Sequence, residues 1–371
     1  MLVQNMLTGG LIAGYDPTAA RHDTWQPSPG QDLHDGRGLH ELLYEDGDPN
    51  QPRGWCAPAT NRVVAQAIEE LDGRIDALAP GDTLRVLDYG TGTGLAAIEL
   101  LKICRERDFE ARLEQRQARV ELHLVDIPGS WFAQGYALLR NCAWTRFHAL
   151  TEVDGRFRPL PEVMGDSRMD LVLASMVFHL VPPRALARVA DGLGAVTKPG
   201  GRLLWTAPDL GPPGSHAVLF HDPNRALRGR WRALVNGEAE PSTAVLRGAV
   251  AAARQRRREE DSLTLDDRAD RRILRRAHTG SEVAAALGRR FEGTIDSAAY
   301  EMTTAETLDT LLVPSNQEEY LPEIEDAATR ASVVEQLMLD EVLPELRSGP
   351  AATANGLNIR WTFGDFHARE D

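Results

Sequence analysis

The feature that most constrains the fold is a glycine-rich turn, VLDYGTGTG, which lies between an apolar run and an amphipathic segment. The run 83–89 has the composition of a buried strand, and apolar residues after the turn recur at the three-and-four spacing of one helix face. Gly90, Gly92 and Gly94 allow backbone angles that other residues avoid and let a ligand approach the main chain. The order of strand, turn and helix predicts a ligand site at a helix N-terminus, where N–H groups are unpaired.

Strands and helices alternate from this turn to about residue 210. The apolar run 119–126 closes on Asp126, and RFHAL, MDLVLASMVFHLV and TKPGGRLLWTA follow as three further strands. The nearly continuous apolar run 169–181 is typical of a central parallel strand that is buried on both faces. Alternation of this kind predicts right-handed crossovers and a Rossmann-like, doubly wound, mostly parallel α/β sheet.

Composition divides the chain into four parts. Residues 1–57 are rich in Gly, Pro, Asp and His, and they predict an irregular arm with one short helix near 39–44. Residues 58–210 form the α/β core. The strand rhythm stops over 211–278, which predicts a charged helical cap inserted after the fifth strand. Residues 279–371 return to helix and strand, and GLNIRWTFGDFHA is the predicted last strand that completes the sheet.

Charge and cysteine content indicate which classes of binding partner are disfavoured. A formal net charge of -14 opposes binding to nucleic acid or an anionic membrane unless a local basic patch exists. The arginine-rich stretches 254–258 and 271–276 are interleaved with acidic residues, which is typical of a solvated, salt-bridged helix surface. Cys56, Cys104 and Cys142 lack metal-ligand spacing and fit the reduced thiols of a cytosolic protein. No apolar run is long enough to span a bilayer. We predict a cytoplasmic protein with no metal, nucleic-acid or membrane partner.

The spacing of the glycines separates two kinds of nucleotide site. Nicotinamide and flavin enzymes carry G-x-G-x-x-G after a strand. The third glycine of that fingerprint would fall at Leu95, whereas Gly94 comes one residue early. Asp88, two residues before the first glycine, is also unusual in a dinucleotide site. The sequence therefore disfavours an NAD(P)-dependent oxidoreductase, which is kept as an alternative.

Four segments in register resemble the class I S-adenosylmethionine-dependent methyltransferases, especially small-molecule enzymes similar to the quinone-biosynthesis C-methyltransferases. VLDYGTGTG resembles the first motif of that family, LVDIP the acidic end of its second strand, MDLVLASMVFHLV its fourth-strand motif, and TKPGGRLLWT the glycine turn before its fifth strand. LNIRWTFG resembles its final, antiparallel strand. The resemblance covers about Thr83 to Ala207 and implies a seven-stranded sheet, S-adenosylmethionine as cofactor and a small-molecule methyl acceptor.

The resemblance also implies a set of cofactor-binding residues. They are Asp88, Gly90, Thr91, Gly92, Gly94, Asp126, Ile127, Ser175 and Met176. Asp88, Gly90 and Gly92 line the methionine end. Asp126 holds the ribose and Ile127 packs on the adenine, while Ser175 and Met176 border the sulfonium. An acidic residue often follows the third strand in this family and touches the adenine amine. Glu152 and Asp154 are both candidates for that position.

The methyl transfer implied by the resemblance needs few catalytic side chains. A sulfonium methyl group is already electrophilic, so alignment of donor and nucleophile at roughly 3–3.5 Å and exclusion of water can supply much of the rate. A base is needed only if the nucleophile carries a proton. His179, after the fourth strand, is the first candidate, and His216 and His221 at the start of the cap are the others. A hydrogen-bonded or exposed structural histidine is the alternative for each.

The arm and the cap both lie where strand ends open, so we expect them to form a lid that shapes the acceptor pocket. Tyr15, Trp25 and Tyr44 of the arm are candidates for closing over the substrate, with ordinary packing as the alternative.

The resulting prediction is a methyltransferase for a small organic molecule, with bacterial specialised metabolism as a setting. A cofactor-binding protein without turnover is the alternative. A nucleic-acid methylase is disfavoured, because SMVFHLVPP replaces the Asn/Asp-Pro-Pro-Tyr/Phe sequence of base-amine methylases. The sequence leaves open which acceptor is used, whether O, N or C is methylated, and the oligomeric state, with a homodimer among the options.

Overall fold

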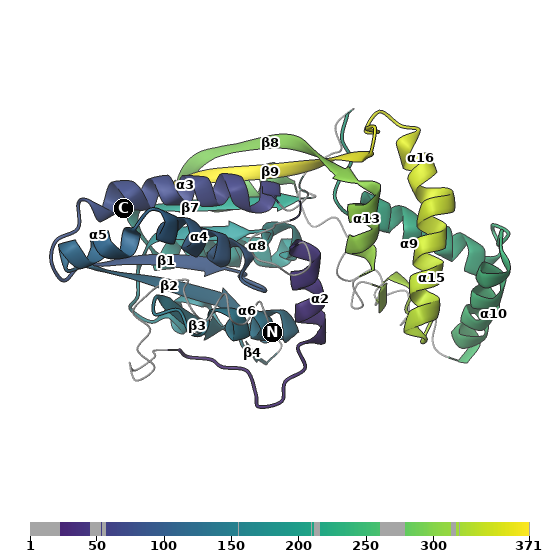
Figure 1. Cartoon of the computed structure of the whole chain (residues 1–371), viewed down its shortest axis with the longest axis horizontal. Helices are drawn as coiled ribbons and strands as arrows, with labels where there is room; N and C mark the ends of the chain where they lie inside the picture. The colour runs from purple at the N-terminus through teal and green to yellow at the C-terminus, as the bar shows by residue number, and fades with distance from the viewer. Residues whose placement is uncertain are drawn as a thin grey trace. The chain divides into compact units, whose positions relative to one another are not determined.

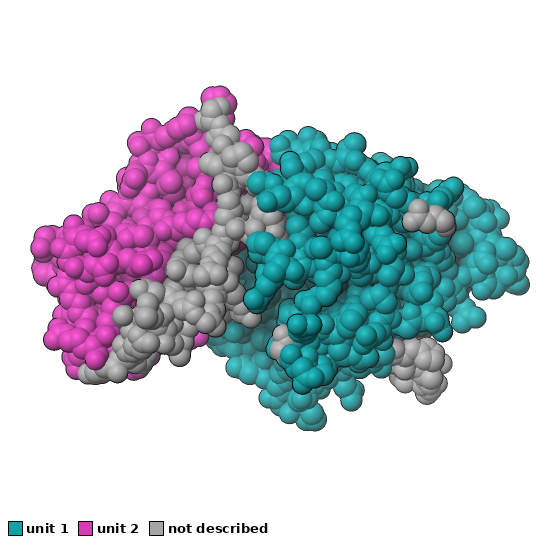
Figure 2. Space-filling view, turned by 180° about the vertical axis from the view of Figure 1, so that it is seen from behind, with its two compact units in different colours: residues 1–207, 278–297, 362–371 teal, residues 208–277, 298–361 magenta. Residues whose placement is uncertain are grey.

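The computed structural model describes residues 23–44, 53, 57–154, 156–208, 210, 216–259, 279–312, 317–318 and 320–370. The chain forms two compact units, drawn in teal and magenta in Figure 2. Unit 1 comprises residues 1–207, 278–297 and 362–371, and unit 2 comprises 208–277 and 298–361. The described part of the expected cap, residues 216–259, belongs to unit 2.

A seven-stranded sheet organises the fold, in the order β3-β2-β1-β6-β7-β9-β8. Its strands are β1 (Thr83–Tyr89), β2 (Arg119–Asp126), β3 (Thr145–Ala149), β6 (Met169–Ser175), β7 (Thr197–Pro208), β8 (Phe291–Thr303) and β9 (Gly356–Ala368). The strand β1 pairs in parallel with β2 and β6, β2 with β3, and β6 with β7. The order changes direction at β1, so the carboxyl end of β1 marks a topological switch point, where α/β sheets bind ligands.

The strand β9 runs against its neighbour β8. The Arg369 N–H donates to the Arg290 carbonyl, whereas at the other end Gly356 lies against the backbone of Met302. Residue numbers therefore rise along one strand as they fall along the other, and Figure 1 shows β9 returning toward the C-terminus. The predicted fold class, a mostly parallel seven-stranded sheet with an antiparallel last strand, is confirmed.

Helices cover both faces of the sheet (Figure 1). One group is α3 (Ala57–Ile75), α4 (Leu95–Glu106), α5 (Phe109–Arg116) and α6 (Ser130–Leu139), and the other is α7 (Leu160–Met164), α8 (Pro183–Val196) and α12 (Gly280–Leu287). A buried apolar cluster joins the first group to alternate residues of the strands, among them Val86, Leu124 and Leu171. This alternation is the two-residue period of a strand. The helix α5 was not expected from the sequence. Only Phe109 and Leu113 are buried along it, and two apolar residues are too few to show a helical period.

The described part of the N-terminal arm packs on unit 1. Residues 23–25 lie along the free edge of β3, where the Thr24 N–H donates to the Phe147 carbonyl at 2.9 Å. Covering an edge strand removes a surface on which another chain could pair. The expected short helix is α2, which spans His34–Leu43 and so begins earlier than predicted. Tyr15 lies outside the described residues.

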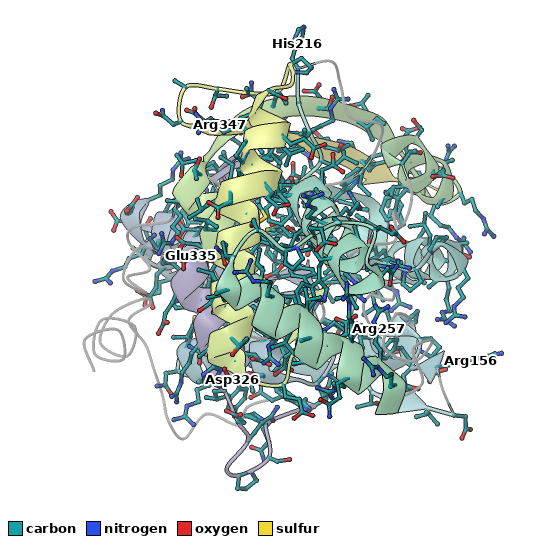
Figure 3. The ribbon with its side chains drawn as sticks, turned by 90° about the vertical axis from the view of Figure 1, so that its right-hand side faces the viewer. Arg156, His216, Arg257, Asp326, Glu335 and Arg347 are labelled. Atoms are coloured by element: carbon teal, nitrogen blue, oxygen red, sulfur yellow. The ribbon has the colours of Figure 1, made fainter. Side chains whose placement is uncertain are left out.

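Unit 2 is largely helical. Its described helices are α9 (Asp222–Asn236), α10 (Ala244–Glu259), α13 (Thr304–Leu311), α15 (Ala327–Leu337), the π-helical turn η4 (Met338–Val342) and α16 (Leu343–Arg347). The segments α15, η4 and α16 follow one another directly, and Figure 3 shows Asp326, Glu335 and Arg347 in this order along them. In the part of the chain that the structure describes, no helix is both long enough and apolar enough to cross a membrane.

Candidate functional site

The glycine turn folds over the end of β2. The N–H groups of Gly90 and Thr91 both donate to the Val125 carbonyl, at 2.7 and 3.2 Å. Gly90, Gly92 and Gly94 have φ angles of 71°, 53° and 90°, in a region that side chains disfavour. Gly94 then caps α4 at its N-terminus. The three glycines therefore supply the three positive φ angles that this turn requires within five residues.

The surroundings of these glycines differ in a way that indicates where a ligand approaches. A Cβ added at Gly90 would lie 2.3 Å from Val177 Cγ2, and one at Gly94 would lie 2.7 Å from Leu139 Cδ1. A Cβ at Gly92 would meet no described atom within 4 Å. Gly90 and Gly94 are packed into the protein, whereas the side of the Gly92 Cα where a Cβ would lie is open among the described residues.

Asp126 fixes this turn from the end of β2. Its Oδ2 accepts the Gly92 N–H and its Oδ1 accepts the Ile127 N–H, each at 2.6 Å. A carboxylate oxygen can accept two hydrogen bonds, so each oxygen keeps capacity for a ligand hydroxyl. Burial raises the pKa of Asp126 to about 6, against the lowering effect of these two backbone N–H groups.

Asp88 supports the turn from beneath. Its side chain is 1% exposed and accepts the Thr91 hydroxyl at 2.7 Å and the Ala97 N–H in the first turn of α4. Burial raises the pKa of Asp88 to about 7, and the nearby Asp126 carboxyl adds to the rise, while the two hydrogen bonds oppose it. The site thus gathers two carboxyl groups that gain from a cation in their vicinity.

An apolar surface continues from Asp126. Ile127 is 47% exposed and Trp131, in the first turn of α6, is 37% exposed. The two candidates for the adenine edge, Glu152 and Asp154, lie on an exposed hairpin of β4 (Glu152–Val153) and β5 (Arg156–Phe157). Large apolar side chains at the surface beside a polar turn are typical of a ligand site.

The end of β6 completes the edge. Ser175 pairs with Thr206 of β7, and the Met176 N–H donates to the Thr206 carbonyl at 2.7 Å. Met176 has a φ of 57°, which is uncommon for a residue with a side chain. This bend directs Val177 onto Gly90, so the β6 turn and the glycine turn are in contact.

The three candidate histidines lie in different units. His179 lies in unit 1, in the 3₁₀ turn η3 (Phe178–Leu180) that follows Val177. His216 and His221 belong to unit 2, where His216 is exposed (Figure 3) and His221 is buried with its ring against Phe220. The residues described contain no group of three or more His, Cys, Asp and Glu side chains that could hold a metal ion.

Comparison with known proteins gives the fold. The sequence matches no protein-family model and no curated protein. Loganic acid methyltransferase with S-adenosylhomocysteine aligns over 94% of this chain and 99% of its own, with a TM-score of 0.51 and 11% identity. The chain has the class I S-adenosylmethionine-dependent methyltransferase fold. Phosphoethanolamine N-methyltransferase 2 from Haemonchus contortus aligns over 92% of this chain and 62% of its own, at 12% identity and a TM-score of 0.39.

In this methyltransferase fold, helix α6 braces the glycine turn, which the sequence analysis missed. A Cβ added at Gly135 would lie 2.7 Å from the Gly92 carbonyl oxygen, so α6 and the turn are in direct backbone contact. Leu139, one turn later, packs on Gly94. The signal was available, because a glycine inside the apolar helix SWFAQGYALL costs helix stability and usually has a packing reason.

Proposed function

We propose that this chain is an S-adenosylmethionine-dependent methyltransferase that acts on a small organic molecule. The observation that carries the proposal is the open Cα face of Gly92, which has a positive φ and whose N–H is held by Asp126. A nucleoside ligand can approach the main chain there and meet a carboxylate at once. The shared fold with loganic acid methyltransferase, which was solved with S-adenosylhomocysteine, supports this choice of cofactor.

The residues present fit the cofactor. The backbone from Gly90 to Gly94 would hold its methionine end, and the remaining lone pairs of Asp126 would accept the ribose hydroxyls. Ile127 and Trp131 offer an apolar face for the adenine. Ser175 and Met176, at the end of β6, would border the sulfonium.

Charge favours this cofactor over a dinucleotide. A pyrophosphate would bring its negative charge to a turn that already has Asp88 beneath it and Asp126 beside it. Like charges at short range repel, whereas the sulfonium and ammonium groups of S-adenosylmethionine attract both carboxylates. Asp88 therefore supports the glycine spacing as an argument against nicotinamide chemistry, whereas an acidic residue after the second strand, such as Asp126, occurs in both kinds of site.

Bound at this edge, the cofactor would supply an electrophilic methyl group to the acceptor. The role of the chain is to hold the acceptor in line and to exclude water. We propose His179 as the group that takes a proton when the acceptor carries one, and turnover by a His179→Gln variant tests this role. The net charge of -14 favours a small acceptor over a polyanion.

Calorimetric titration with S-adenosylhomocysteine tests the proposal. We expect saturable binding at one site, and methyl transfer when S-adenosylmethionine and a panel of small nucleophiles are supplied. Binding with no turnover across a broad panel would favour a cofactor-binding protein. The absence of any heat of binding, with no rise in melting temperature, would overturn the proposal.

The pH dependence of binding provides a further prediction. The pKa values of Asp88 and Asp126 are raised to about 7 and about 6, so both groups stabilise the ligand-free fold at low pH and lose that effect as the pH rises through these values. A cationic ligand favours their ionised forms. We expect S-adenosylmethionine to bind more tightly as the pH rises from about 5 to about 8 and to release protons in that window.

Calorimetry in two buffers of different ionisation enthalpy measures this release. S-adenosylhomocysteine is the matched control, because it lacks the sulfonium charge and should release fewer protons. Equal release by both ligands at about pH 6.5, or proton uptake by either, would contradict the assignment.

A further inference from the structure

The described arm, residues 23–44, touches both helices that flank the glycine turn. At its start, Trp25 stacks on Phe132 of α6, with ring centroids 4.3 Å apart and 13° between the planes. At its end, the buried Tyr44 donates its hydroxyl to Glu99 of α4 at 3.3 Å. The helix α4 begins at the turn itself, and α6 begins just after Asp126.

Between these contacts, the first turn of α2 sits directly on the first turn of α6 (Figure 1). The Gly36 N–H donates to Ser130 Oγ at 2.8 Å. A Cβ added at Gly36 would lie 2.3 Å from the Ser130 carbonyl oxygen and 2.7 Å from Gln134 Cβ. Backbone does not yield at such distances, so only glycine allows the arm to seat here.

The same segment of α6 meets the arm and the cofactor turn. Gln134 is in contact range of Gly36, and the next residue, Gly135, lies against the Gly92 carbonyl. Close-packed helices transmit small shifts rather than absorb them. A displacement of α6 by a few tenths of an ångström at Gly36 would therefore reach the backbone that faces the ligand.

We propose that Trp25, Gly36 and Tyr44 are positioning residues that hold α6 and α4 against the glycine turn, so that the seated arm slows release of an adenosyl nucleoside. The inference rests on the proposed function, because it assigns a role in the exchange of that cofactor. It differs from a lid over the acceptor, since the arm acts through two helices and not by contact with the substrate.

The matched pair Gly36→Ala and Gly73→Ala tests the proposal in the full chain. Gly73 lies in α3, where an added Cβ meets no described atom within 4 Å. Both variants therefore replace a helical glycine by alanine, but only Gly36→Ala introduces a clash with α6. A stopped-flow chase gives the dissociation rate of S-adenosylhomocysteine, and direct mixing of protein and ligand gives its association rate. Tryptic cleavage after the exposed Arg37 of α2 reports whether the arm has left.

We expect Gly36→Ala to release S-adenosylhomocysteine about tenfold or more faster than wild type, with faster cleavage at Arg37 and an association rate within about twofold. Trp25→Ala, which removes the stack on α6, should act in the same direction. Gly73→Ala should match the wild type in all three measurements. A purely structural role would lower the melting temperature and leave the dissociation rate unchanged.

Two results would overturn the inference while the wild-type chain still binds the ligand. One is cleavage at Arg37 that accelerates with no more than about a twofold change in the dissociation rate. The other is unchanged cleavage in both Gly36→Ala and Trp25→Ala, because these contacts would then not hold the arm. A wild-type chain that binds no S-adenosylhomocysteine overturns the proposed function itself, and the inference with it.

Discussion

Asp126→Ala is expected to weaken the binding of S-adenosylhomocysteine by roughly a hundredfold or more. Each hydrogen bond from a ribose hydroxyl to a carboxylate contributes about 1.5–3 kcal/mol, and the loss of two such bonds corresponds to about 3 kcal/mol at the least. The variant also frees the Gly92 N–H, which Asp126 holds at 2.6 Å, so the turn loses its fixed conformation. Isothermal titration calorimetry at a pH above 7 measures the change with the wild-type carboxylate ionised.

Asp76→Ala is the control, since Asp76 is 65% exposed and pairs with Arg112 at the surface. Exposed pairs contribute little, so its affinity should equal that of wild type. Circular dichroism and the melting temperature establish that both variants fold. An Asp126→Ala protein that folds and binds S-adenosylhomocysteine within about threefold of wild type would exclude Asp126 from the ribose site.

Much of the fold follows from local patterns in the sequence. The run VLDYGTGTG predicted a strand, a left-handed turn and a helix, because glycine spacing and apolar periodicity act over a few residues. The last strand GLNIRWTFGDFHA coincides with β9, since a long alternating run has few other structures open to it. The alternation of strands and helices predicted a doubly wound, mostly parallel sheet, whereas the seven strands and the antiparallel last strand were implied by the resemblance to the methyltransferases.

The packing contacts that hold the glycine turn in place could not be predicted from local patterns. Val177 against Gly90, and Gly135 against Gly92, join residues that are far apart in the sequence. Their contacts depend on how close two elements approach, and no periodicity encodes that distance. The hairpin of β4 and β5 was not predicted for another reason. Each strand has only two residues, which is too short to show an alternating pattern.

One ion pair of unit 2 could not be predicted from the sequence. Arg254 and Arg258 are exposed, as expected of a solvated, salt-bridged helix surface, but Arg257 on α10 (Figure 3) reaches the buried carboxylate of Glu323 at 2.7 Å. Glu323 is fully buried and also binds Arg228 and the Trp231 indole N–H, at 2.9 and 3.0 Å. Burial alone would raise the pKa of Glu323, but the guanidinium groups of Arg228 and Arg257 keep it below its ordinary value.

Glu323→Ala is accordingly expected to destabilise unit 2 by about 3–5 kcal/mol. Removing one partner of a buried ion pair leaves the other charge without compensation, and the Arg228 side chain is only 2% exposed. Hydrogen exchange of the backbone amides in α9, which contains Arg228 and Trp231, measures the loss locally. Because the pKa of Glu323 is lowered, its contribution is present at neutral pH and falls as the pH drops below about 4.5.

Glu325→Ala is the matched control two residues away. Glu325 is 79% exposed and pairs with Arg256 of α10 at 3.1 Å, a distance similar to those at Glu323, so the two variants compare a surface ion pair with a buried one in the same segment. The exposed pair should contribute less than about 1 kcal/mol. Equal exchange rates of the α9 amides in the two variants would show that burial of Glu323 does not stabilise unit 2, and that helix packing around Trp231 holds it together without the carboxylate.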